Sequence, residues 1–132
     1  MHNVELERVA KMFLDAVGRC DIATLSELST DDMTWWMMPG NKFSGTHAKR
    51  DYLANLPTLL ENASGYLTFE YFEITGETDR LAIVAEGDLS MNDGRHYQNN
   101  YHFLLKFCDG KVESGKEFTD SLHINEIFGA PE

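Results

Sequence analysis

The sequence has 132 residues, enough for one domain whose core needs neither a disulfide nor a metal. Hydrophobic residues make up 42% of it, and 22 acidic against 11 basic residues give a net charge of −11. Because such an acidic surface repels phosphate groups, we expect neither a nucleic acid nor an anionic membrane as a partner.

The two cysteines and the N-terminal segment indicate the expected cellular compartment of the protein. Cys20 and Cys108 stand far apart in no metal-ligand spacing, so both are expected to be reduced thiols. The first residues do not have the pattern of a signal peptide, and no apolar run has membrane-spanning length. We therefore expect a cytoplasmic protein.

The first half of the chain predicts helices with one strand between them. Residues 3–19 carry apolar side chains at helical spacing, and Asp21 is the expected N-cap of a short second helix. The run MTWWMM at residues 33–38 predicts the first strand. A third helix is expected from Thr46 as its N-cap, with a kink or restart at Leu56–Pro57, because proline lacks the backbone donor.

The second half predicts four antiparallel strands, because stretches of alternating or apolar residues are separated by tight turns. Asp109-Gly110 is the strongest hairpin signal among these turns. The strands are expected at residues 66–76, 81–91, 96–107 and 112–119. The order of elements predicts one α+β domain over residues 1–132, in which a strongly bent antiparallel sheet has helices on its concave face.

Three stretches carry a family resemblance: TDDMTWWMMPG, FSGTHAKRDYLANL and YQNNYHFLLKFCDGKVESGKEFTD. In their order along the chain they resemble the SnoaL-like, ketosteroid-isomerase-like branch of the NTF2-like superfamily. The resemblance implies the NTF2-like (cystatin-like) cone-shaped α+β barrel with a deep pocket, often a homodimer through the outer sheet face. It does not imply one activity, since the superfamily includes isomerases, cyclases, hydrolases and binding modules.

The sequence departs from some members of this branch at their catalytic positions. Steroid isomerases have a carboxylate in the first strand, where this chain has Met37 and Met38, and a tyrosine in the first helix, where it has Phe13. Limonene-epoxide hydrolases have an Arg-x-Asp pair where this chain has Tyr97-Gln98-Asn99. What matches is Asp120 in EFTD, which resembles the E-[YF]-x-D ending of polyketide-cyclase-like members, whose aspartate is a base.

The candidate catalytic residues are Asp120, Asn99, Tyr97 and Tyr101. Asp120 follows Phe118 and could be a desolvated general base, or else a carboxylate that caps the strand end. Asn99 and the two phenols could donate hydrogen bonds to a developing enolate, or else form a buried polar ladder that satisfies the backbone.

The candidate ligand-binding residues are mostly large and apolar. Adjacent tryptophans in a strand point to opposite faces, so one of Trp35 and Trp36 is expected to line a cavity while the other packs elsewhere. Glu86 lies in an apolar run and must face a wet pocket or pair with a basic residue, of which pairing is favoured. The full set is Trp35, Trp36, Met38, Phe118, Glu86 and Phe13.

These features predict a small-molecule enzyme of the SnoaL-like type, which transfers a proton on an apolar carbonyl-containing substrate without a cofactor. The alternatives are a non-catalytic module that binds a hydrophobic small ligand, and a structural dimer with a vestigial cavity. No metal site is expected, because the histidines show no ligand spacing. The expected partners are a small hydrophobic molecule and a second copy of the chain, with His102 on the outer face at that contact.

Overall fold

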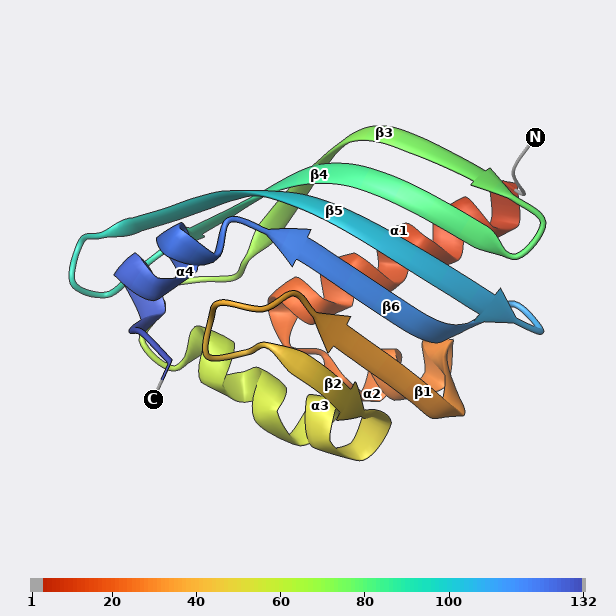
Figure 1. Ribbon diagram of the computed structural model, residues 1–132, viewed down its shortest axis with the longest axis horizontal. Coiled ribbons are helices and arrows are strands. Elements are labelled where there is room, and N and C mark those ends of the chain that lie inside the picture. The colour runs from red at the N-terminus through yellow and green to blue at the C-terminus, as the bar shows by residue number, and fades with distance from the viewer. Residues whose placement is uncertain (1–3, 132) are drawn as a thin grey trace.

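The computed structural model describes residues 4–131, which form a curved six-stranded sheet and four α-helices (Figure 1). None of the described helices is long and apolar enough to cross a membrane. The elements in chain order are α1 (Val4–Arg19), α2 (Ile22–Leu28), β1 (Ser29–Met37), β2 (Gly45–Ala48), α3 (Lys49–Asn55), the 3₁₀ helix η1 (Leu56–Leu60), β3 (Thr68–Glu77), β4 (Arg80–Ser90), β5 (His96–Cys108), β6 (Lys111–Thr119) and α4 (Ser121–Phe128).

The strand order is β2-β1-β6-β5-β4-β3. The last four strands form the expected antiparallel meander, but β1 runs parallel to β6 and antiparallel to β2. The prediction of a wholly antiparallel sheet was therefore wrong at this one pair. The sheet is mixed, and the predicted α+β cone fold is confirmed.

Two predicted boundaries in the first half of the chain were wrong. Thr46 does not cap a helix; it pairs with Trp36 in the β1–β2 ladder, and α3 begins at Lys49. The first strand was predicted to begin at residue 33, but β1 already begins at Ser29. The expected restart at Leu56–Pro57 is confirmed, since α3 ends at Asn55 and η1 begins at Leu56 with the proline in its first turn.

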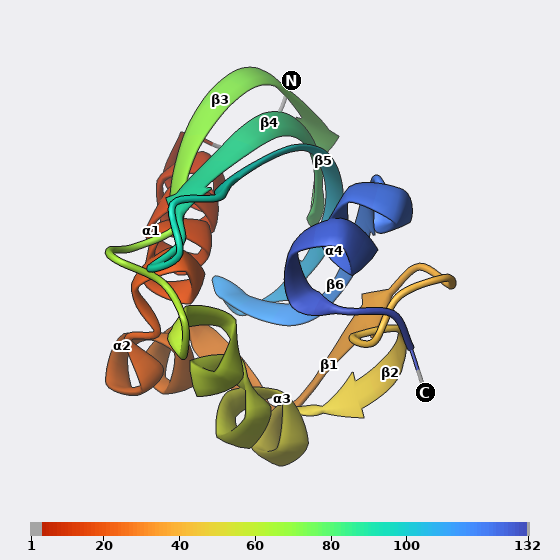
Figure 2. The same cartoon turned by 90° about the vertical axis from the view of Figure 1, so that its left-hand side faces the viewer.

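The core lies on the concave face of the sheet. Alternate residues of β4 and β5 point inward against α1, while the residues between them face outward. Figure 2 shows the sheet curving around one side, with α1, α2 and α3 on the other and α4 at one end. The largest fully buried side chains are Trp35, Tyr97, Phe13, Phe103, Leu14, Leu25, Met33, Leu81, Ile83, Leu89, Leu105 and Val112.

Candidate functional site

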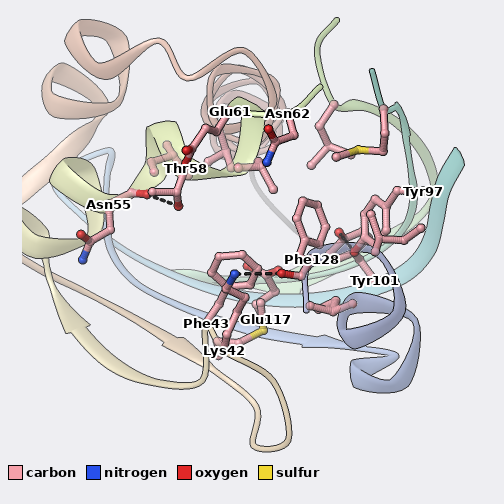
Figure 3. Close-up of a pocket in the computed structure, with 18 of the residues that line it drawn as sticks. Lys42, Phe43, Asn55, Thr58, Glu61, Asn62, Tyr97, Tyr101, Glu117 and Phe128 are labelled. Carbon is pink, nitrogen blue, oxygen red and sulfur yellow. Dashed lines mark hydrogen bonds between the residues drawn. The ribbon is translucent and has the colours of Figure 1, made fainter. Parts of the chain in front are cut away.

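A cavity of about 670 Å³ lies between the concave sheet face, the α3–η1 segment and α4 (Figure 3). Its walls are mainly aromatic and aliphatic, with polar groups inside and at the rim. The residues that line it are Val17, Trp35, Met37, Lys42, Phe43, His47, Tyr52, Asn55, Leu56, Thr58, Leu59, Glu61, Asn62, Leu67, Phe69, Met91, Asn92, Asp93, Arg95, Tyr97, Tyr101, Phe103, Glu117, Ile124, Ile127 and Phe128.

Glu117 places a carboxyl group in this cavity. It is paired with Phe103 across the β5–β6 ladder, and both residues point inward. The indole Nε1 of Trp35 donates a hydrogen bond of 2.9 Å to its Oε1. Burial raises the pKa of Glu117 from 4.5 to about 7, and the Trp35 hydrogen bond opposes this rise only in part.

A stack of rings holds Trp35 against this carboxyl group. The indole lies between Phe13, at 5.6 Å between centroids, and Tyr52, at 5.2 Å. The stack needs Gly115, which pairs with Trp35 in the β1–β6 ladder, because a Cβ at this glycine would lie 2.1 Å from the indole. Burial, and next the Glu117 carboxylate, raise the pKa of Tyr52 well above its ordinary value.

Two phenols and an amide form a second polar group on β5. The hydroxyls of Tyr97 and Tyr101 are 2.5 Å apart, and Asn99 Nδ2 donates to Tyr97 Oη at 3.0 Å. All three side chains are buried. Burial raises the pKa of Tyr97 to about 12 and that of Tyr101 well above its ordinary value, so both phenols are neutral hydrogen-bond donors at pH 7.

The Asp120 carboxyl group lies outside the cavity lining. It accepts a hydrogen bond of 3.0 Å from the backbone N–H of Leu122 and so caps α4. Its backbone, in contrast, contacts the polar cluster on β5, because Asn99 Nδ2 donates a hydrogen bond of 3.0 Å to the Asp120 carbonyl oxygen. The structure therefore brings Asn99, Tyr97 and Tyr101 together and places the fourth candidate, Asp120, at the start of a helix.

Three predicted ligand-binding residues lie on the convex face and not in the cavity. The rings of Trp36 and Phe118 pack against each other there, with centroids 5.1 Å apart. Glu86 accepts a hydrogen bond from Gln98 on the same face, and among residues 4–131 it forms no ion pair with a basic residue. The physical reason is strand parity, since these residues alternate with inward-facing neighbours on β1, β6 and β4.

The other two candidates also stand outside the lining. Met38 follows β1, and its Sδ accepts the backbone N–H of Thr119 at 3.2 Å. Phe13 is fully buried behind Trp35 and supports the wall without reaching the cavity. Trp35, Tyr97 and Tyr101 are thus the predicted site residues that line the cavity.

Sequence reasoning missed Glu117, Tyr52 and the wall made by α4. The Asp109-Gly110 turn predicts the hairpin, but by itself it would pair Phe103 with Lys116. Only the register shift between Lys106 and Phe107, a β-bulge or irregularity that the turn does not predict, brings Glu117 across from the inward-facing Phe103. The wall had no local signal either, since α4 is held by distant residues. Lys42 donates to its Phe128 carbonyl and Arg95 to its Glu126 carbonyl.

Comparisons with solved structures show the fold. An NTF2-like protein from Burkholderia xenovorans LB400 is 23% identical with a TM-score of 0.74, over 96% of this chain and 97% of that one. An NTF2-like protein from Burkholderia pseudomallei K96243 is 14% identical with a TM-score of 0.81, over 96% and 98%. AusH from Aspergillus nidulans is 16% identical with a TM-score of 0.76, over 91% and 86%.

The family is shown by the sequence match. Among curated proteins, none matches this chain. Within the described residues, no cluster of three or more His, Cys, Asp or Glu side chains could hold a metal ion. The model of the SnoaL-like domain matches residues 10–114, which is most of the chain. The chain therefore belongs to the SnoaL-like domain family.

Proposed function

We propose that this protein is an enzyme that moves a proton on a small, apolar, carbonyl-containing substrate without a cofactor, and that Glu117 is its general acid and base. The observation that carries the proposal is a carboxyl group with a pKa of about 7 in an aromatic cavity. A group with a pKa near the working pH is present in both protonation states, which suits it to take and return a proton.

The neighbours of Glu117 have separate roles in this proposal. The Trp35 N–H fixes one carboxyl oxygen, and the other is then free to face the substrate. The phenol pair of Tyr97 and Tyr101 supplies a donor for the oxygen of an enolate that forms when the proton leaves carbon. The apolar walls hold the carbon skeleton, and 670 Å³ lies in the usual range for small-molecule pockets, about 300–1,000 Å³.

Proton exchange on a simple ketone tests the proposal without knowledge of the natural substrate. The α-protons of 2-tetralone are followed by NMR in D2O, with wild type, Glu117→Gln and Glu86→Gln. Wild type and Glu86→Gln should accelerate the exchange equally, because Glu86 lies on the convex face. Glu117→Gln should lose roughly 10²–10⁴-fold, the usual contribution of a positioned acid or base. Exchange in Glu117→Gln at the wild-type rate would remove Glu117 from this role.

A non-catalytic binding module is the second candidate, and the largely apolar lining of the cavity favours it. Such a module needs the walls but not the carboxyl group. In that case wild type would bind 2-tetralone without accelerating exchange, and Glu117→Gln would bind it at least as tightly. The same samples therefore separate the two functions.

A further inference from the structure

The amide of Asn99 can stand in only one orientation. Its Oδ1 accepts the backbone N–H groups of Asn100, at 2.9 Å, and of Asp120, at 3.3 Å. Its Nδ2 donates to the Asp120 carbonyl and to Tyr97 Oη, both at 3.0 Å. A flipped amide would set its NH₂ group against two N–H donors, and its oxygen against a carbonyl. All four hydrogen-bonding positions of this buried side chain are therefore occupied, and they are satisfied only in this orientation of the amide.

This orientation determines what the two phenols can offer. Tyr97 Oη accepts from Asn99, so the hydrogen between the phenols comes either from Tyr97 or from Tyr101. If Tyr97 donates to Tyr101, the Tyr101 hydrogen remains. If Tyr101 donates to Tyr97, the Tyr97 hydrogen remains, with the Thr119 hydroxyl near it. In both arrangements the bonds within this three-residue cluster leave one phenolic hydrogen over.

We propose that Asn99 is a positioning residue that acts through Tyr97, and that the phenol pair presents this one O–H to an acceptor oxygen of the ligand, a ketone or enolate oxygen. The inference rests on the proposed function and deepens it, since it states which polar group of the substrate lies at β5. Glu117 then removes or returns a proton at the carbon bonded to that carbonyl carbon.

The register of the sheet allows the phenol pair to hold the ligand oxygen while Glu117 transfers the proton. Tyr101 pairs with Thr119, and Phe103 pairs with Glu117, so Tyr101 and Glu117 are diagonal neighbours on one face of β5 and β6. Diagonal residues on neighbouring strands stand about 7–8 Å apart, which lets the phenol and the carboxyl group reach one small molecule from two sides. Both residues line the cavity, as Figure 3 shows.

A pair of probes with the same shape tests the inference. 2-Acetylnaphthalene offers a carbonyl oxygen, and 2-isopropenylnaphthalene has a CH₂ group in its place. The affinity ratio of ketone to alkene is measured at pH 9 in a Glu117→Gln background, so that the result does not depend on proton transfer. The infrared band of the bound ketone carbonyl gives a second readout, because a hydrogen bond lowers its frequency.

The phenol variants have a distinctive expected pattern. Tyr97→Phe and Tyr101→Phe should each keep most of the ketone preference, because each leaves one phenolic hydrogen. The double variant should lower the ratio by roughly 3- to 10-fold, the effect of one lost hydrogen bond, and raise the carbonyl frequency. A double variant with the ratio and band of its parent would overturn the proposal.

Asn99→Asp separates a positioning role from a steric one. The new carboxylate has the same shape but only accepts, so Tyr97 turns its hydrogen toward it and Tyr101 donates to Tyr97. No hydrogen remains, and the ratio should fall as in the double phenol variant. An unchanged ratio in folded Asn99→Asp would end the role of Asn99. If that variant does not fold, Asn99→Leu is used. It leaves one phenolic hydrogen but removes the donor that holds the Tyr97 oxygen in place, so the carbonyl band should move part of the way toward that of the double phenol variant. An unmoved band counts against the positioning role.

Discussion

At the scale of single residues, Glu117 carries a cost in stability that depends on pH. Its pKa is near 4.5 when exposed and about 7 in the folded protein, so between these values the folded state binds more protons than the unfolded state. The protonated Glu117 therefore makes its full contribution to the stability of the folded protein below pH 4.5. This contribution is lost as the pH rises through 7.

Glu117→Gln should remove this cost, because an amide does not ionise and can still accept the Trp35 hydrogen bond. The variant should be more stable than wild type by up to about 3 kcal/mol above pH 7, and the difference should vanish near pH 4.5. Urea unfolding at pH 4.5, 6 and 8 measures this. A constant difference across the three pH values would mean that the carboxyl group is not held neutral by burial. Added stability with lost exchange activity is the usual trade-off at an active site.

Substitution of Asp120 is expected to lower stability and to leave activity intact, the reverse of the expectation for Glu117→Gln. Asp120→Asn keeps an oxygen that can accept the Leu122 N–H but removes the charge at the N-terminus of α4, while Asp120→Ala removes both. The alanine variant should lose about 0.5–2 kcal/mol of stability, and the asparagine variant less. Exchange activity per folded molecule should survive in both. Thermal melts and the 2-tetralone assay together check this, and an inactive but stable Asp120→Asn would return the aspartate to the catalytic site.

At the scale of elements, the parallel pairing of β1 with β6 brings Trp35 beside Gly115. Since a Cβ at Gly115 would overlap the indole, Gly115→Ala should push Trp35 away from Glu117 and destabilise the protein by about 1–3 kcal/mol, as overpacking does. Gly65→Ala is the control, because a Cβ there meets nothing within 4 Å. Chemical unfolding and tryptophan fluorescence report both effects. If the two alanine variants had equal stability, the close packing of Trp35 on Gly115 would be disproved.

At the scale of the whole molecule, the convex face of the sheet predicts a homodimer. Trp36 and Phe118 pack together there beside His102, and Phe118 is 40% exposed. Aromatic side chains grouped on an open sheet face are typical of an interface. Light scattering should give twice the mass of the chain at micromolar concentration, and Phe118→Lys should give a folded monomer. Met12→Lys is the control, because Met12 is an apolar residue with the same 40% exposure but lies on α1 and not on the convex sheet face. A wild-type monomer would contradict the prediction.

The sequence alone was sufficient for the type and order of most elements. The meander of β3 to β6, the amphipathic α1 and the restart at Pro57 follow from local periodicity, turn residues and the missing proline N–H. The inward parity of Tyr97, Asn99 and Tyr101 follows in the same way, because alternate residues of one strand share a face. These are properties of neighbouring residues, which the order of the chain contains directly.

Only the tertiary structure decided which residues meet. The parallel β1–β6 pair joins segments about 80 residues apart, and it alone sets Trp35 on Glu117. β2 is a strand because an edge of β1 is open to it, although residues 45–48 have the local pattern of a helix start. Asp120 and Glu117 are equally acidic in the sequence. Their surroundings separate them, since one carboxyl group meets the free N–H groups of a helix and the other meets aromatic rings.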